Sequence, residues 1–259
     1  MPRLAANLSM LFNEHDFLDR FAAARKCGFE AVEFLFPYAF PKKEIAARLA
    51  GSGLQQVLFN VAQGDWDKGD RGIGAVPGRE AEFREAIEIA LDYADTLDCP
   101  RLHVMAGLSK DGANVETFAA NLAWAAPLAK QAGVQLMLEP LNAVDFPGYV
   151  NASVETALWL IAKSGSDNVF LQYDAYHLQM SQGRLLQTFR DHQPIIRHVQ
   201  IAGVPGRNEP DSSQEINFPA LFALLDELGY SGWVSGEYRP RGKTTDGLGW
   251  AAPWGIKAA

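Results

Sequence analysis

Four residues with side-chain oxygens stand where apolar stretches of strand length come to an end. They are Glu139 in VQLMLEP, Asp174 in VFLQYD, Gln200 in IRHVQIAG and Glu237 in GWVSGEY. Carboxylates that share one pocket repel each other, and a divalent cation relieves that repulsion while keeping them ionised. Oxygen ligands without Cys or His favour Mg²⁺ or Mn²⁺ over a dedicated zinc site. The pattern therefore predicts a magnesium or manganese site.

Other polar residues are candidates for holding an anionic substrate. Arg207, in GVPGRNEPD, can clamp a carboxylate through two hydrogen bonds, although an exposed loop arginine explains the sequence equally well. His177, in YDAYH, is a candidate donor to a substrate oxygen or a structural histidine beside the site. His103 faces the same choice with the structural role favoured, and Asn7 and Glu33 are weaker candidates for lining the pocket. Surface or packing roles are expected for His15, His192 and His198.

Strands and helices must alternate along the whole chain to bring these residues together. Strands are expected at 4–8, 31–34, 54–60, 102–105, 134–139, 169–174, 196–201 and 233–237. Helices are expected between them, most clearly at 79–97, where apolar residues recur every three or four positions. Strict alternation predicts a parallel sheet, and eight units predict closure into a single (β/α)8 TIM barrel. Active sites of such barrels lie at the carboxyl ends of the strands, where the four residues fall.

Local signals add detail to this expectation. Helix starts are expected at the capping residues Asp16, Ser153 and Asn217. A long glycine-rich loop with Trp66, VAQGDWDKGDRGIGAVPGR, follows the third strand and fits an active-site cover or a mobile surface loop. An open doubly wound sheet is the alternative fold, but it needs a glycine fingerprint after the first strand, where SMLFNEHD stands.

Composition narrows the class of protein. One barrel accounts for all 259 residues, so 1–259 is expected to be one catalytic domain. A formal net charge of −8 without a basic run argues against nucleic acid as a partner. Two cysteines, no signal-peptide pattern and no long apolar stretch favour a cytoplasmic protein without a membrane segment. A homo-oligomer is left open, because Trp250 and Trp254 could seal either the barrel or a dimer contact.

Short motifs follow one another along the chain from Arg3 to about Trp250. They are ANLSMLF, VEFLFPY, GDW, PGRE, LEPLN, QYDAYH, VQIAG, QEINF and GEYRPRG. Together they resemble the hydroxypyruvate isomerase family of xylose-isomerase-like barrels, which includes the closely related 2-oxo-tetronate isomerases. GEYRPRG and the start MPRLAANLSM look most like the 2-oxo-tetronate branch, whereas EPLN and DFPGY look equally like hydroxypyruvate isomerases.

The resemblance implies an activity and roles for the residues at the strand ends. The family's acid/base glutamates match Glu139 and Glu237, and its metal ligands match these two together with Asp174 and Gln200. The implied reaction is an aldose–ketose type isomerisation of a small anionic hydroxy-oxo acid through an enediolate. Hydroxypyruvate would give 2-hydroxy-3-oxopropanoate (tartronate semialdehyde), and 2-oxo-tetronate would react likewise. Arg207 would hold the substrate carboxylate, and His177 would polarise a hydroxyl group.

Three other functions are consistent with the same fold. A DNA-repair endonuclease would need a histidine-rich zinc cluster and a basic groove, which the charge and the histidine positions oppose. A ketose 3-epimerase usually carries a histidine where this chain has Gln200. A non-catalytic barrel that binds a sugar acid would have no need of two glutamates suited to proton transfer.

Overall fold

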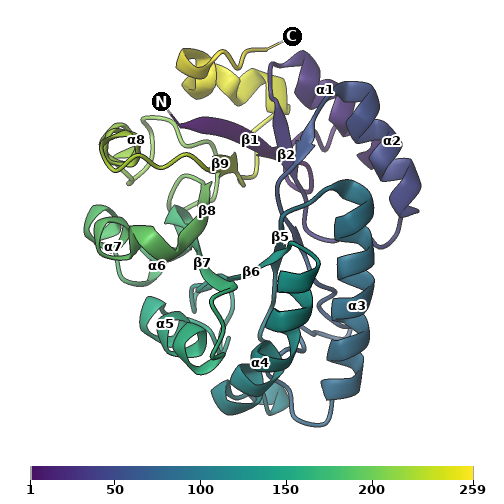
Figure 1. Cartoon of the computed structure of the whole chain (residues 1–259). Coiled ribbons are helices and arrows are strands. Elements are labelled where there is room, and N and C mark those ends of the chain that lie inside the picture. Colours follow the sequence, from purple (N-terminus) through teal and green to yellow (C-terminus); the bar gives the residue numbers. More distant parts are fainter. Residues whose placement is uncertain (1, 259) are drawn as a thin grey trace.

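The computed structural model describes residues 2–258, and the expected strands form one sheet that curls into a barrel (Figure 1). The strands are β1 (Arg3–Asn7), β2 (Ala31–Glu33), β3 (Gln55–Gln56), β4 (Phe59–Asn60), β5 (Arg101–His103), β6 (Gln135–Leu138), β7 (Val169–Asp174), β8 (Ile196–Ile201) and β9 (Trp233–Gly236). Neighbouring strands run parallel in the order β3-β2-β1-β9-β8-β7-β6-β5-β4.

The two strands at the ends of this order close the barrel, because β3 and β4 are halves of one segment. On one side of that segment, the amide of Val57 donates to the carbonyl of Val32 at 2.9 Å. On the other side, the amide of Val61 donates to the carbonyl of His103, also at 2.9 Å. The third expected strand is thus broken at its middle but pairs with both neighbours. The predicted (β/α)8 barrel is confirmed.

Helices surround the barrel on its outside (Figure 1). The α-helices are α1 (Arg20–Lys26), α2 (Lys42–Ser52), α3 (Glu80–Leu97), α4 (Val115–Gln131), α5 (Val154–Lys163), α6 (Ala175–Ser181), α7 (Leu185–His192) and α8 (Phe218–Glu227). Short 3-10 helices are η1 (Phe17–Asp19), η2 (Ser109–Asp111), η3 (Gln193–Ile195) and η4 (Thr244–Trp254). The described helices include none that is long and apolar enough to cross a membrane.

Two of the three expected helix caps are confirmed. Ser153 accepts a hydrogen bond from the amide of Thr156, and Asn217 accepts one from the amide of Ala220, each at 3.1 Å. The cap expected at Asp16 is wrong: its side chain caps no helix within residues 2–258, because the turn η1 intervenes before α1 begins.

Trp250 and Trp254, near the C-terminus, are half-buried and pack against the core of the same chain. The indole nitrogen of Trp250 donates to the hydroxyl of Tyr238 at 3.2 Å. The ring of Trp254 meets Phe222 edge-on, with centroids 4.9 Å apart. These contacts hold η4 against α8 and against Tyr238. They therefore serve to hold the barrel together.

Candidate active site

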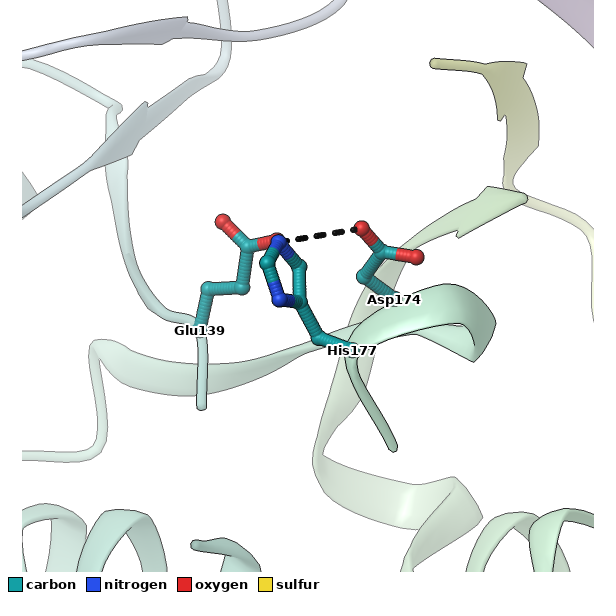
Figure 2. Close-up of side chains that lie close together, drawn as sticks. All are labelled: Glu139, Asp174 and His177. Carbon is teal, nitrogen blue, oxygen red and sulfur yellow. Dashed lines mark ion pairs between the residues drawn. The ribbon is translucent and has the colours of Figure 1, made fainter. Parts of the chain in front are cut away.

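The strand ends bring the four expected residues to one rim of the barrel. They are Glu139, directly after β6, Asp174 at the end of β7, Gln200 within β8 and Glu237, directly after β9. At most 5% of each residue's surface is exposed. Figure 2 shows Glu139 and Asp174 directed toward each other, with the ring of His177 beside both carboxylates. The rim predicted from the sequence exists, and it is crowded with buried acidic groups.

Glu139 lies at the centre of the acidic group. Its Oε2 accepts a hydrogen bond of 3.0 Å from Gln172, whereas its buried Oε1 finds no hydrogen-bond partner among the described residues. Burial, followed by the charges of Glu237 and Asp174, raises the pKa of Glu139 well above its usual range. Burial also raises the pKa of Asp174. These carboxyl groups hold protons tightly unless a cation offsets their charge.

Arg207 supplies one such cation. Its Nη2 lies 2.7 Å from Oε2 of Glu237 and 3.5 Å from Oδ2 of Asp174. Burial raises the pKa of Glu237 to about 8, although the charge of Arg207 acts in the opposite direction. Arg207 was predicted as a clamp for substrate, and the structure places it at the site with Nη2 already bound to Glu237. One guanidinium cannot neutralise three carboxylates, so the binding of a further cation at this site is favourable.

His177 belongs to a group of three side chains whose ligand atoms could hold a metal ion. Its Nε2 lies 3.9 Å from Oε1 of Glu139 and 3.8 Å from Oδ2 of Asp174. Its Nδ1 accepts a hydrogen bond of 3.1 Å from the backbone amide of Asn142. Burial, with help from the charge of Arg207, lowers the pKa of His177 well below its usual range, so the ring is neutral. The single ring proton then lies on Nε2, which leaves that atom as a donor without a lone pair for a metal.

Gln200 is joined to the acidic group through a chain of buried hydrogen bonds. Its Oε1 accepts from Nε2 of Gln172 at 2.6 Å, and the same Nε2 also donates to Glu139. Its own Nε2 donates to Oε1 of Glu33 at 2.8 Å. The other oxygen of Glu33 contacts Nε2 of His198. Burial by itself would raise the pKa of Glu33, but His198 and these hydrogen bonds hold it below its usual range.

Asn7 and His103, two of the weaker candidates from the sequence, both lie beside the carboxylates, but only one of them lines the cavity. Asn7 is fully buried behind Glu237 and donates to Oε1 of Glu237 at 3.0 Å and to Oε1 of Glu33 at 2.9 Å. Asn7 thus orients Glu237 and does not line the cavity of the described site. His103 does line the cavity, with Nδ1 3.4 Å from Oε2 of Glu139. Burial lowers the pKa of His103 to about 3, which keeps its ring neutral.

A cavity of about 400 Å³ opens above these groups. Its walls include Glu139, Glu237, His177, His103 and Arg207, together with Trp66, Arg71 and Arg239. Trp66 and Arg71 come from the long loop after β4, and the Arg71 guanidinium lies 3.5 Å from the centroid of the Trp66 ring. The interpretation of this loop as an active-site cover is therefore supported, and the volume suits a small molecule.

Sequence reasoning missed several residues of the site. Gln172 and His198 stand two positions before Asp174 and Gln200, and residues two apart on a strand face the same side. Extending each strand-end residue inward by this period would have found both. Arg71 has no comparable signal, because a loop without regular structure gives no spacing to read.

One glycine fixes the covering loop to the rim. Gly72 has φ of +112° and is bridged to Ala106, just after β5, and an added Cβ would lie 2.6 Å from the backbone carbonyl of Met105. We expect Gly72→Ala to lower the free energy of unfolding by roughly 2–5 kcal/mol, from backbone strain and overpacking together. Urea unfolding followed by circular dichroism measures this loss.

The matched control is Gly78→Ala in the same loop. Gly78 has φ of +85°, but a Cβ there would meet nothing within 4 Å. Only the backbone strain of about 1–2 kcal/mol should remain. Equal losses in the two variants would contradict the close packing of the loop on the rim.

Comparisons with known proteins agree with this geometry. A family model described as "Xylose isomerase-like TIM barrel" matches residues 21–254. The 2-oxo-tetronate isomerase of Cupriavidus necator is 49% identical over 98% of this chain and 99% of its own length. The hydroxypyruvate isomerase of Escherichia coli is 41% identical over 98% of this chain and 100% of its own. A crystal structure described as an AP endonuclease of family 2 from Brucella melitensis is 46% identical, with a TM-score of 0.95 over 98% of this chain and 99% of that one.

Proposed function

Since this chain belongs to the xylose isomerase-like TIM barrel family, we propose that it converts small hydroxy-oxo acids by moving a carbonyl group between neighbouring carbons. The predicted family and the predicted isomerase class are confirmed by relatives of 41–49% identity that carry isomerase names. The observation that carries the proposal is the pair Glu139 and Glu237 on the wall of one cavity, both with raised pKa. In this proposal residues 1–259 act as one catalytic domain.

The two glutamates would move the protons of the reaction. Proton transfer works best when the pKa of the acid/base group lies near the working pH. Without a bound ion the pKa of Glu237 is raised to about 8, and a cation beside it would lower that pKa and favour the ionised form that acts as a base. One carboxylate takes the proton from the hydroxyl-bearing carbon beside the carbonyl group, a carboxylate returns a proton to the former carbonyl carbon, and the hydroxyl proton passes to the former carbonyl oxygen. The Nε2–H of His177 donates a hydrogen bond to a substrate oxygen between them. In this proposal these groups would carry the protons as an enediolate forms and breaks down.

A divalent ion, Mg²⁺ or Mn²⁺, fits the residues present. The buried Oε1 of Glu139 lacks a hydrogen-bond partner within residues 2–258, and the acidic group exceeds its one arginine in charge. Glu139, Asp174 and Glu237 would hold the ion, with Gln200 as a further ligand through the second lone pair of its amide oxygen. When bound, such an ion polarises the carbonyl and hydroxyl oxygens of the substrate.

The comparisons support a choice between the two substrate lengths. The 2-oxo-tetronate isomerase is the more similar of the two named relatives, at 49% identity against 41% for the hydroxypyruvate isomerase. We therefore favour the four-carbon acid 2-oxo-tetronate over hydroxypyruvate as the better substrate. Hydroxypyruvate would give 2-hydroxy-3-oxopropanoate by the same route.

The carboxylate of the substrate would be held by Arg71 together with Arg207. Nη2 of Arg207 is shared with Glu237 and Asp174, whereas Arg71 lines the cavity and forms no ion pair within the described chain. A charged hydrogen bond contributes about 1.5–3 kcal/mol, so we expect Arg71→Met to raise KM roughly 10- to 100-fold with a smaller change in kcat. Steady-state kinetics on 2-oxo-tetronate measure both constants.

Arg84→Met is the matched control for that variant. The Arg84 guanidinium also stacks on a tryptophan, 5.0 Å from the centroid of Trp124, but it lies outside the cavity. This variant loses a similar stacking contact and should keep a normal KM. A rise in KM of equal size in both variants would exclude carboxylate binding by Arg71.

The direct test of the proposal uses proton NMR in D₂O. Chelator-stripped protein is incubated with hydroxypyruvate or 2-oxo-tetronate, with and without Mg²⁺ or Mn²⁺. Isomerisation with deuterium uptake supports proton transfer through an enediolate, whereas isomerisation without uptake indicates a hydride shift. Lack of turnover of both acids would overturn the proposal, and a ketohexose added in parallel would then test a 3-epimerase.

The DNA-repair alternative can be tested separately. The Brucella melitensis structure bears an endonuclease description, but this chain has a net charge of −8. Within the described residues, the one cluster of side chains that could hold a metal ion contains a single histidine. Nucleic-acid binding draws its affinity largely from contacts of basic residues with phosphates. Cleavage of a duplex with an abasic site, or salt-dependent binding to it, would favour the endonuclease.

A further inference from the structure

A second cavity, of about 440 Å³, opens at the amino-terminal mouth of the barrel, opposite the candidate active site. Three arginines line it at the starts of three strands: Arg3 on β1, Arg101 on β5 and Arg197 on β8. No aspartate or glutamate is among its described lining residues. The cavity is therefore positively charged, in a chain with 31 acidic and 23 basic residues.

The three guanidinium groups contact neutral partners. Arg3 donates to the carbonyl of Ser231 at 2.6 Å and stacks over Trp233, 4.3 Å from the ring centroid. Arg197 lies 4.6 Å from the centroid of the Phe170 ring. Aromatic stacking fixes the plane of a guanidinium group while leaving its edge free for hydrogen bonds. Two of the arginines are thus oriented without having their charge neutralised.

Arg101 has fewer hydrogen-bond partners than its guanidinium group can bind. Its Nη1 reaches the carbonyl of Val57 at 3.4 Å, but its buried Nε has no hydrogen-bond partner in residues 2–258. Burial lowers the pKa of Arg101, and the neighbouring charges of Arg197 and Arg3 lower it further. Buried polar groups are nearly always paired, so the described chain satisfies the guanidinium of Arg101 incompletely.

Two arginines at the surface provide a contrast, because each is paired with an acidic side chain. Arg190 pairs with Glu227 at 3.0 Å, and Arg241 pairs with Asp211 at 2.7 Å. The three cavity arginines form no ion pair within the described chain, although acidic residues outnumber basic ones. An anion bound between them would lower their mutual repulsion.

We propose that this cavity binds a small tetrahedral oxyanion, either inorganic phosphate or the phosphate group of a small ester. Guanidinium groups match phosphate oxygens through paired hydrogen bonds, and three of them converge on one cavity. A layer of apolar side chains, Ala5, Ala31, Val57 and Trp233, lies next to the cavity across the barrel interior. The site is thus separate from the acidic rim and independent of the proposed isomerase activity.

Titration of the full-length protein with inorganic phosphate, at constant ionic strength and with chloride as reference, tests this proposal. Calorimetry gives the affinity, and the NMR signal of the Trp233 indole reports binding at this mouth. We expect saturable binding that shifts the Trp233 signal and that weakens about tenfold or more in Arg101→Gln, as loss of a charged hydrogen bond predicts. Arg197→Gln, at a second position of the same cavity, should weaken binding similarly if Arg101→Gln fails to fold.

The matched control is Arg190→Gln, which removes an arginine paired with Glu227 at the surface and should bind phosphate normally. A phosphate ester titrated in parallel separates the two sources: tighter binding of the ester identifies an ester ligand, and weaker binding identifies free phosphate. Absence of saturable binding, an unmoved Trp233 signal, or equal affinity in Arg101→Gln, Arg197→Gln and wild type would overturn the proposal.

Discussion

Glu237→Gln should lower kcat by about 10²- to 10⁴-fold while the protein stays folded, which is the usual contribution of a general acid or base. The glutamine keeps the shape of the side chain and can still accept the hydrogen bond from Asn7, now 3.0 Å. It cannot accept a proton from carbon, and it removes the anionic partner of Arg207. Turnover of 2-oxo-tetronate by NMR, with circular dichroism for the fold, measures the effect.

Glu227→Gln provides the matched control, because Glu227 is also paired with an arginine but lies at the surface beside Arg190. It should retain normal kcat. Saturating Mn²⁺ separates two roles of Glu237: recovery of activity would show that its loss only weakened metal binding. Near-normal turnover in Glu237→Gln without added metal would remove this residue from the mechanism.

Removal of divalent metal should abolish turnover and should also change how stability depends on pH. The folded-state pKa of Glu237 is raised from 4.5 to about 8 when no ion is present, so the folded metal-free protein binds its proton more tightly than the unfolded chain. Stability from this group is therefore present below pH about 4.5 and is lost as pH rises toward 8. Thermal unfolding of the stripped protein between these limits measures the slope.

Added Mg²⁺ or Mn²⁺ should reverse that slope, since a cation stabilises the ionised carboxylates. The increase in Tm on adding metal should thus grow with pH. Asp174→Asn, which removes one charge from the group, should show a smaller increase at every pH. A chelated protein with full activity, or a rise in Tm that does not depend on pH, would exclude metal at this rim.

The barrel and its acidic rim could be predicted because both follow from periodic patterns. Strand ends at Glu139, Asp174 and Glu237 are marked by apolar runs, and parallel strands must place those ends together. The broken third strand and the helix α6 gave no such signal. The start of α6 depends on Asp174, whose carboxylate accepts a hydrogen bond from the amide of Tyr176, a contact that the spacing of residues does not reveal.

The partners of charged groups also could not be predicted. Whether Arg207 holds substrate or Glu237 depends on distances between segments far apart in sequence. The same applies to His177, whose proton is placed on Nε2 by the backbone amide of Asn142. The residue types identified Arg207 and His177 as candidate site residues, but tertiary contacts determine the orientation of each side chain.

A buried chain of hydrogen bonds runs from Glu33 through Gln200 and Gln172 to Glu139. It affects how the substrate range of this enzyme can change. Its members hold one another in place from beneath the cavity, so Glu139, one of the two proposed acid/base residues, needs little reorganisation when a substrate arrives. The loop with Trp66 and Arg71 shares no side chain with that chain of bonds. Changes in the loop can therefore alter which acids are accepted, while the residues proposed to transfer protons stay unchanged beneath it.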